Sequence, residues 1–224
     1  MSTQLEDWPQ QATQGHKIPG SRYTSKEFLE QEWEGMWTKA WLLLGREAEL
    51  PNFGDWQKEE LGREEILMVR QKDGSVKAFY NVCQHRGNPL VEETKGHVLQ
   101  RFVCKYHSWA FLPDGKLNFA PDKEDFPEGN PCDNVRLSEL KCETFAGFIW
   151  VNMDPDCISL QEYLGPIWEE WEQREIHTWK RTSANTMWLP CNWKIVLDNF
   201  NESYHVPTVH MSATPDTDRK KIRG

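Results

Sequence analysis

Two short segments of this chain each place a cysteine close to a histidine. Cys83 and His85 are separated by one residue, Cys104 and His107 by two, and each pair follows a β-prone run. A strand that ends in a turn presents the residues of that turn at a loop tip, so two neighbouring hairpins can direct four side chains to one point. Thiolates and imidazoles bind zinc, iron and iron–sulfur clusters in proteins. The pattern therefore predicts a metal centre built from two loops.

Two kinds of metal centre accept two cysteines and two histidines. Zinc binds such a set tetrahedrally in structural sites. A cluster of two irons can instead bind both cysteines through one iron and both histidines through the other. Zinc fingers usually group cysteine with cysteine and histidine with histidine, whereas here each segment supplies one of each. The spacing favours the iron–sulfur cluster, and a zinc-stabilised binding module is the alternative.

A second set of candidate ligands lies near the end of the chain. We expect residues 192–204 to form a helix, and Asp198, Glu202 and His205 to share a face. Glu202 and His205 are three residues apart, so their side chains project together. A carboxylate beside an imidazole is a common beginning of a metal-binding set.

A further histidine follows a proline in the same segment. Pro207 interrupts the predicted helix, which lets His210 turn back toward His205. Two imidazoles beside an acidic face supply two thirds of the triad that holds non-haem Fe(II) in oxygenases. Scattered surface histidines and a zinc hydrolase site are the alternatives for this pattern taken alone.

The residues of the first centre, CQHRG at 83–87 and CKYHSW at 104–109, resemble the [2Fe–2S] motif of a Rieske domain. Neither segment carries the additional cysteine of the Rieske proteins in respiratory complexes, so the resemblance is to the oxygenase and ferredoxin branch. Trp109 is expected to pack beneath the cluster and keep water out. The resemblance implies four cluster ligands, Cys83, His85, Cys104 and His107.

The run NWKIVLDNFNESYHVPTVH at 192–210 resembles the catalytic-domain motif of Rieske non-haem iron oxygenase α subunits. The resemblance implies that His205 and His210 bind a mononuclear Fe(II). Glu202 matches the carboxylate that, in this family, bridges to a cluster-bound histidine of the neighbouring subunit. A homotrimer is thereby implied.

Such an α subunit is the oxygenase component of a multicomponent enzyme. The resemblance implies that electrons from NAD(P)H reach the cluster through a ferredoxin or a flavin reductase and pass to an iron that activates O2. A small aromatic or amine substrate would then be hydroxylated, dihydroxylated or dealkylated, and some members of the family add a small β subunit. The alternative is a Rieske-type electron carrier without catalysis of its own, which would have no use for Glu202, His205 and His210.

The third iron ligand of the family is a carboxylate far downstream in the catalytic domain. After His210 only Asp216 and Asp218 carry carboxylates, and both lie in a polar tail. We therefore expect this chain to be the N-terminal portion of a longer α subunit. The third carboxylate ligand would be absent from it, and the chain alone would be inactive.

The expected fold class is α+β, with three parts along the chain. Residues 1–40 form an N-terminal arm and helix, 41–156 an antiparallel β Rieske domain, and 157–224 the beginning of a helix-grip-like catalytic domain. Two Asp-Gly pairs between β-prone runs, at 73–74 and 114–115, predict tight hairpins because such turns need a positive φ.

Helix signals flank the β region on both sides. Residues 24–27, TSKE, match a capping box, and the apolar spacing that follows predicts an amphipathic helix over 25–39. Ser159 is positioned to cap a helix that continues to about residue 174.

Composition excludes several classes of protein. The chain has 224 residues, with 26 Lys and Arg against 35 Asp and Glu, and its net charge of −9 argues against nucleic-acid binding. It contains neither an apolar run of roughly 18–20 residues nor a signal sequence at its start, so we expect a cytoplasmic protein without membrane segments. Four further cysteines lack ligand spacing and are expected to be structural or incidental, and these are Cys132, Cys142, Cys157 and Cys191.

Overall fold

The computed structural model describes residues 18–210 of the chain. These residues divide into two compact units, one running from Trp33 to Thr182 and the other made of 18–32 together with 183–210. The first unit holds all the described strands, and the second is helical. No described helix has the length and apolar character needed to cross a membrane.

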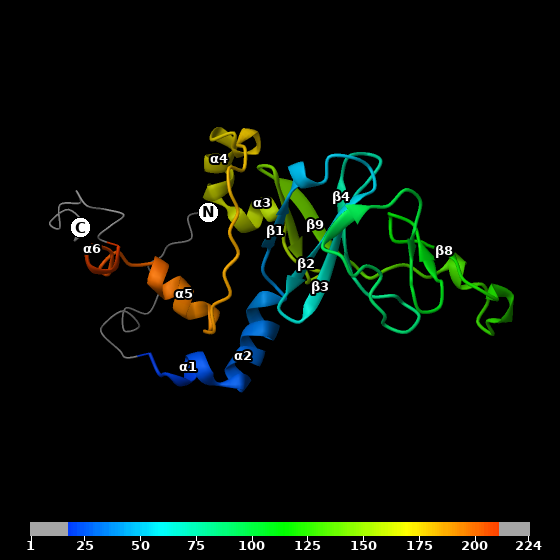
Figure 1. Ribbon diagram of the computed structural model, residues 1–224, viewed down its shortest axis with the longest axis horizontal. Helices are drawn as coiled ribbons and strands as arrows, with labels where there is room; N and C mark the ends of the chain where they lie inside the picture. The colour runs from blue at the N-terminus through cyan, green and yellow to red at the C-terminus, as the bar shows by residue number, and fades with distance from the viewer. Residues whose placement is uncertain (1–17, 211–224) are drawn as a thin grey trace. The chain divides into compact units, whose positions relative to one another are not determined.

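A twisted antiparallel sheet forms the centre of the first unit, and Figure 1 shows several of its strands side by side. Each strand pairs antiparallel with its neighbours. In the described part of the chain this sheet has seven strands, in the spatial order β1 (Leu42–Arg46), β10 (Phe148–Asn152), β9 (Glu139–Phe145), β4 (Val76–Tyr80), β3 (Glu64–Arg70), β2 (Asp55–Leu61) and β5 (Lys95–His97).

A smaller sheet consists of β6 (Phe102–Val103), β7 (Ala110–Phe111) and β8 (Leu117–Phe119). Both predicted hairpins are confirmed, because β3 pairs with β4 around Asp73-Gly74 and β7 pairs with β8 around Asp114-Gly115. Gly74 and Gly115 have φ values of 85° and 87°, which glycine adopts without steric cost. The antiparallel β domain expected from the sequence is therefore present.

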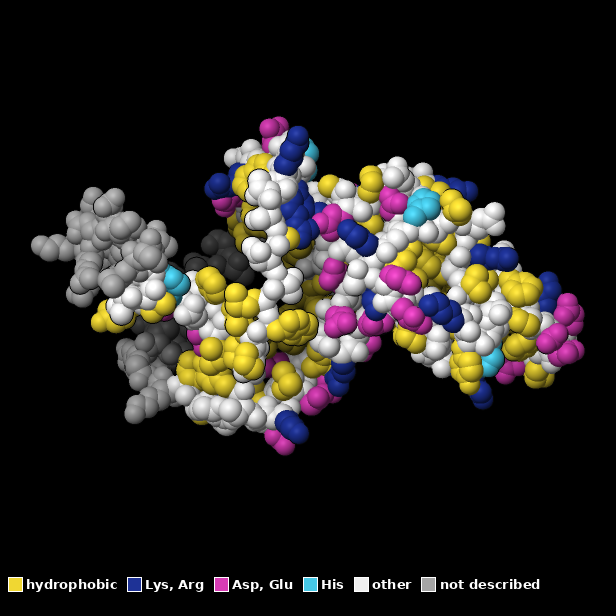
Figure 2. Space-filling view, viewed as in Figure 1, with side chains coloured by type: hydrophobic (Ala, Val, Ile, Leu, Met, Phe, Trp, Pro, Cys, Tyr) yellow, Lys and Arg dark blue, Asp and Glu magenta, His cyan; other side chains and the backbone are white. Residues whose placement is uncertain are grey.

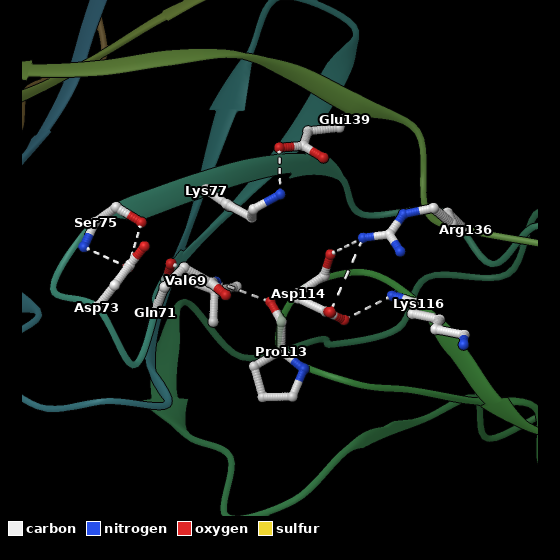
Figure 3. Close-up of polar contacts among 10 residues, drawn as sticks. All are labelled: Val69, Gln71, Asp73, Ser75, Lys77, Pro113, Asp114, Lys116, Arg136 and Glu139. Carbon is white, nitrogen blue, oxygen red and sulfur yellow. Dashed lines mark hydrogen bonds and ion pairs between the residues drawn. The ribbon is translucent and has the colours of Figure 1, made fainter.

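The ends of these two hairpins are tied together by a buried glutamine (Figure 3). The Gln71 side chain is 8% exposed, and its Nε2 donates to the carbonyl oxygens of Val69 at 3.1 Å and Pro113 at 2.9 Å. On the second hairpin, the Arg136 guanidinium donates to the Asp114 carbonyl oxygen at 2.8 Å. The bond from Gln71 to Pro113 ties the hairpin of the smaller sheet to that of the larger one, and Arg136 ties it to the segment before β9.

Strand β3 is buried on both faces, and its side chains alternate between two cores. Leu67 and Val69 pack in a cluster that also contains residues of the smaller sheet, such as Phe111. Ile66 and Met68 point to the opposite face, where they join a second cluster. The cluster shared by the two sheets also contains the thiols of the first predicted metal centre.

The N-terminal helix is shorter and more broken than the predicted helix over 25–39. It consists of α1 (Ser21–Thr24), α2 (Lys26–Glu32) and a π-helical turn at Trp33–Trp37. Ser25, rather than Thr24, caps α2, because the Phe28 N–H donates to the Ser25 hydroxyl at 3.1 Å. Thr24 is instead the last residue of α1, whose closing bond runs from the Ser25 N–H to the Ser21 carbonyl oxygen.

The helix predicted to begin after Ser159 is split in two. Ser159 caps α3 (Leu160–Leu164) as expected, accepting the Glu162 N–H at 3.2 Å. Gly165 then adopts a φ of 52° and Pro166 begins α4 (Pro166–Gln173), so the chain turns between the two segments. Short 3-10 turns complete the described elements of this unit at Glu47–Glu49, Lys123–Asp125, Pro131–Asp133 and Ile176–Thr178.

In the second unit, the helix predicted over 192–204 ends four residues early. It is α5 (Trp193–Phe200), capped by Asn192, and α6 (Val206–Val209) follows after a turn. The Glu202 carboxylate accepts backbone N–H groups in this turn, which competes with helical bonding. Pro207 therefore does not end a helix but lies in the first turn of a new one, where its missing N–H is tolerated.

Apolar side chains of α5 reach the surface of this unit. Figure 2 shows hydrophobic side chains gathered over the helix. Ile195 and Leu197 are each nearly half exposed, and Phe200 is 80% exposed.

Candidate metal centres

The loop after β4 carries the first predicted pair of ligands and is closed by its own backbone. The Cys83 N–H donates to the Asn88 carbonyl oxygen at 2.8 Å, and the Gly87 N–H donates to the Cys83 carbonyl oxygen at 2.9 Å. Gly87 has a φ of 74°. Glycine at this position allows the sharp reversal that the two hydrogen bonds require.

The loop after β6 repeats this turn with the same offsets of four and five residues. The Cys104 N–H donates to the Trp109 carbonyl oxygen at 2.8 Å, and the Ser108 N–H donates to the Cys104 carbonyl oxygen at 3.0 Å. Ser108 has a φ of 60° although it is not glycine. A left-handed conformation of this kind costs an L-residue roughly 1 kcal/mol, so the second loop carries backbone strain that the first avoids.

The four predicted cluster ligands meet as two pairs. Cys83 and Cys104 are both 2% exposed, and their thiols lie within hydrogen-bonding reach of each other. The imidazole rings of His85 and His107 lie edge to face, with centroids 4.6 Å apart. Each pair takes one member from each loop, and a Rieske cluster holds one iron through two thiolates and the other through two imidazoles.

The protonation of His85 fits metal ligation, and opposing contacts act on the Cys83 thiol. Burial lowers the pKa of His85, so its imidazole is neutral, and within the described residues its buried Nδ1 has no hydrogen-bond partner. Burial raises the pKa of the Cys83 thiol, while the backbone N–H groups of His85 and Arg86 act in the opposite direction. An unpaired buried nitrogen calls for a partner, and neutral imidazole is the form that binds metal.

The two imidazoles have different neighbours. His85 stacks on Trp109, with centroids 4.8 Å apart and planes 12° from parallel, and Trp109 is 5% exposed. Phe126 packs against the same indole at 5.9 Å. His107 instead lies 3.7 Å from the ring of Tyr106, which is 59% exposed. One imidazole is thus shielded by a buried ring, and the other adjoins a ring that reaches the surface.

Glu202 lies in the turn between α5 and α6, and His205 and His210 flank the two ends of α6. The Glu202 carboxylate contacts Nδ1 of His205, and the rings of His205 and His210 have centroids 5.4 Å apart. The hydrogen bond from His205 lowers the pKa of Glu202, which keeps the carboxylate ionised. Across residues 18–210 no three or more His, Cys, Asp or Glu side chains form a group that could hold one metal ion. Asp216 and Asp218 lie outside the described residues.

Asp198 does not share the face of Glu202 and His205 as the sequence predicted. Glu202 lies beyond the end of α5, and the Asp198 carboxylate accepts a hydrogen bond of 2.8 Å from the Tyr23 hydroxyl. This hydrogen bond raises the pKa of Tyr23. Asp198 therefore connects α5 to α1.

A lysine on α5 makes a second connection to the N-terminal helices. Lys194 Nζ lies 2.8 Å from the Glu32 carboxylate, and these side chains are only 16% and 11% exposed. The same ammonium lies 5.3 to 5.7 Å from the ring centroids of Tyr23, Phe28 and Trp193. We call the set Tyr23, Phe28, Glu32, Trp193, Lys194 and Asp198 the Lys194 clasp.

Sequence reasoning missed Asn81, which lies two residues before Cys83. It is a polar residue within the apolar run VKAFYNVC, and its side chain is 1% exposed. A lone amide at a strand end is the only signal that the sequence offers. The six cysteines between residues 18 and 210 are all free thiols, and His97 pairs with Asp55 at 2.8 Å.

Two family models match this chain. Residues 40–139 match the Rieske [2Fe-2S] domain, and residues 175–223 match the ring hydroxylating alpha subunit (catalytic domain).

Curated relatives include mono- and dioxygenase subunits. The carnitine monooxygenase oxygenase subunit of Escherichia coli (strain K12) is 34% identical over 195 residues, which cover 86% of this chain and 52% of the relative. The biphenyl 2,3-dioxygenase subunit alpha of Rhodococcus jostii (strain RHA1) is 34% identical over 200 residues, covering 85% and 42%. The chain thus spans about half the length of the curated relatives that it matches.

Solved structures resemble the chain to a similar extent. A quaternary ammonium Rieske monooxygenase, CntA, in complex with L-carnitine has a TM-score of 0.81 at 30% identity, covering 90% of this chain and 57% of that one. A naphthalene 1,2-dioxygenase with indole bound in its active site has a TM-score of 0.70 at 31% identity, covering 86% and 44%.

Proposed function

Because this chain belongs to the Rieske oxygenase α subunits, we propose that it is part of the oxygenase component of a multicomponent enzyme. In that component a [2Fe–2S] cluster would supply one-electron transfer and a mononuclear Fe(II) would supply O2 activation. The substrate would be a small aromatic or amine compound, which is hydroxylated, dihydroxylated or dealkylated. A ferredoxin or an NAD(P)H-dependent flavin reductase would deliver the electrons.

The meeting of the two cluster loops carries this proposal. Cys83 and Cys104 would hold one iron, and His85 and His107 the other. The neutral imidazole of His85 and its unpaired buried Nδ1 are what such a ligand requires, and both thiols lie buried in the same core. Trp109, stacked on His85, would exclude water from that side.

At the second centre, His205 and His210 would bind the mononuclear iron. Glu202 would orient His205 through its contact with Nδ1, and would bridge to a cluster-bound histidine of a neighbouring subunit in a homotrimer. The third ligand would be a carboxylate from outside residues 18–210, within which no group of three or more candidate side chains could hold one metal ion. The domains proposed are 1–40, 41–156 and 157–224, with the cluster in the second and the iron in the third.

A Rieske-type electron carrier is the second candidate, because the strands form a compact unit of their own, Trp33–Thr182. The contacts among Glu202, His205 and His210 favour the oxygenase, since a carrier does not use a second metal centre.

Electron paramagnetic resonance of the dithionite-reduced protein, with iron and sulfide analysis, tests the first centre. We expect a Rieske-type spectrum and two irons per two sulfides in the purified chain. Cys104→Ser should abolish the spectrum, and Cys132→Ser, which removes a half-buried cysteine of the same unit, should leave it unchanged. A colourless protein that contains zinc would refute the proposal. Three irons per two sulfides, together with hydroxylated product, would refute the expectation that the chain alone is inactive.

A further inference from the structure

Asn81 lies between β4 and the first cluster loop, and its amide is fully buried. A buried amide without hydrogen bonds costs several kcal/mol on transfer from water. Its side chain forms bonds with two other parts of the chain, which are the strand β3 and the far end of the loop.

Every hydrogen-bonding position of this amide is used. Nδ2 donates to Oε2 of Glu65 at 2.8 Å and to the Val91 carbonyl oxygen at 2.8 Å. Oδ1 accepts the N–H groups of Leu90 at 3.0 Å and Val91 at 3.1 Å. Two donors and two acceptor positions are the complete capacity of an asparagine side chain.

These bonds close the cluster loop across its base. Asn81 precedes Cys83 by two residues, while Leu90 and Val91 are the residues at which the loop returns to the core. The side chain of Asn81 therefore joins the two ends of the loop, outside the backbone bond between Cys83 and Asn88. The position equivalent to Asn81 in the second loop is Phe102, which is held by packing in β6.

A salt bridge fixes the orientation of the amide. Oε1 of Glu65 lies 2.7 Å from Lys58 Nζ, and the Lys58 side chain is 10% exposed. The hydrogen bond from Lys58 lowers the pKa of Glu65, so the carboxylate can only accept. The NH2 group of Asn81 must then face Glu65, which leaves Oδ1 of Asn81 to accept the N–H groups of Leu90 and Val91.

We propose that Asn81 is a positioning residue for the iron–sulfur cluster, and that it holds the loop bearing Cys83 and His85 in its ligating shape. This inference rests on the cluster of the proposed function. Lys58 and Glu65 hold the Asn81 side chain in the orientation that joins the two ends of the loop. The backbone bonds of the loop do not make this connection. Because Lys58 lies in β2 and Glu65 in β3, these three side chains anchor the loop to two strands of the larger sheet.

Asn81→Asp is the sharpest test, because it keeps the shape of the side chain, removes its two donors and places a negative charge beside the Glu65 carboxylate. The carboxylate would then face the acceptor oxygens of Glu65 and Val91. We expect cluster bleaching in the presence of an iron chelator to be roughly 10- to 100-fold faster. We expect the amide hydrogens of Leu90 and Val91 to exchange faster by a similar factor. Asn118→Asp, the same change at an exposed position of β8, should alter neither rate more than twofold.

A rescue separates positioning from a general loss of stability. Adding Glu65→Gln to Asn81→Asp restores a donor to the pair, and we expect at least half of the lost protection of Leu90 and Val91 to return. Glu65→Ala removes one of the four hydrogen bonds and leaves Asn81 in place, so it provides a milder variant if Asn81→Asp fails to fold.

The outcomes distinguish this inference from the proposed function. A wild-type protein without a cluster would refute the function, while the exchange rates of Leu90 and Val91 would still decide the role of Asn81. Wild-type rates of bleaching and exchange in Asn81→Asp, or in Glu65→Ala if the first variant does not fold, would overturn the inference.

Discussion

Replacing Lys194 with methionine should detach the N-terminal helices from α5. Methionine keeps an apolar stem of similar length, so this change removes mainly the positive charge of the Lys194 ammonium. Glu32 would remain, 11% exposed and without its partner, and the rings of Tyr23 and Phe28 would lose the ammonium between them.

The expected loss follows from the burial of the pair. Removing one partner of a buried ion pair costs about 3–5 kcal/mol, whereas a surface pair contributes about 0–1 kcal/mol. Side-chain exposures of 16% and 11% place Lys194 and Glu32 between these limits. Three rings within 5.7 Å of the ammonium add to the loss. We expect about 3 kcal/mol in the free energy of local opening, which is roughly 100-fold in an exchange rate.

Hydrogen exchange measured by mass spectrometry reports this opening directly. Amides of α2 should exchange roughly 100-fold faster in Lys194→Met, while those of β3 in the other unit should not change. Lys26→Met is the matched control, because Lys26 is an exposed lysine of α2. The double variant Glu32→Gln with Lys194→Met should lose less than Lys194→Met alone, since no charge is left unpaired.

Equal exchange of α2 in Lys194→Met and Lys26→Met would refute this reasoning. It would mean that apolar packing alone holds α2 against α5. If the double variant loses as much protection from exchange as Lys194→Met, the unpaired Glu32 charge contributes nothing to the loss. The contacts of the ammonium with the aromatic rings would then account for all of it.

Three further results are expected. Trp109→Ala should cost about 3–5 kcal/mol in urea unfolding and Trp109→Phe clearly less, because the alanine variant leaves a cavity beside His85; equal costs would contradict this. Stability should decline as the pH falls below about 4, since Glu65 has a lowered folded-state pKa and stabilises only while ionised; Glu65→Gln should flatten this decline in a pH series of thermal melts. Iodoacetamide at pH 8 should label exposed Cys191 and spare Cys142, whose pKa burial raises to about 12, as peptide mass spectrometry would show; early labelling of Cys142 would contradict its burial.

Local signals in the sequence predicted the hairpins well. Asp73-Gly74 and Asp114-Gly115 are turns whose backbone requirement is met by their own residues, so no distant contact is needed to form them. Strand β3 was also predicted, because its unbroken run of apolar β-forming residues is typical of a strand that is buried on both faces.

One error arose where a side chain competes with the backbone. α5 ends at Phe200, and in the turn that follows the Glu202 carboxylate accepts the N–H groups of Tyr204 and His205, which apolar spacing does not reveal. Asn81 escaped notice for a different reason. Its partners Glu65 and Val91 lie sixteen residues before it and ten after it, so only the folded chain shows that its amide is satisfied.

The matching turns of the two cluster loops have a consequence for protein engineering. Each loop closes with two backbone bonds between residues no more than five apart, and each begins directly after a short strand. The turn at the tip of each loop is closed by its own backbone bonds, so a graft of the first loop would need Lys58, Glu65 and Asn81 as well, to close its base. With these residues, the pair of loops could be transplanted onto other antiparallel β proteins whose neighbouring hairpins end side by side. The Ser108 position would best be glycine in such a graft, since φ is positive there.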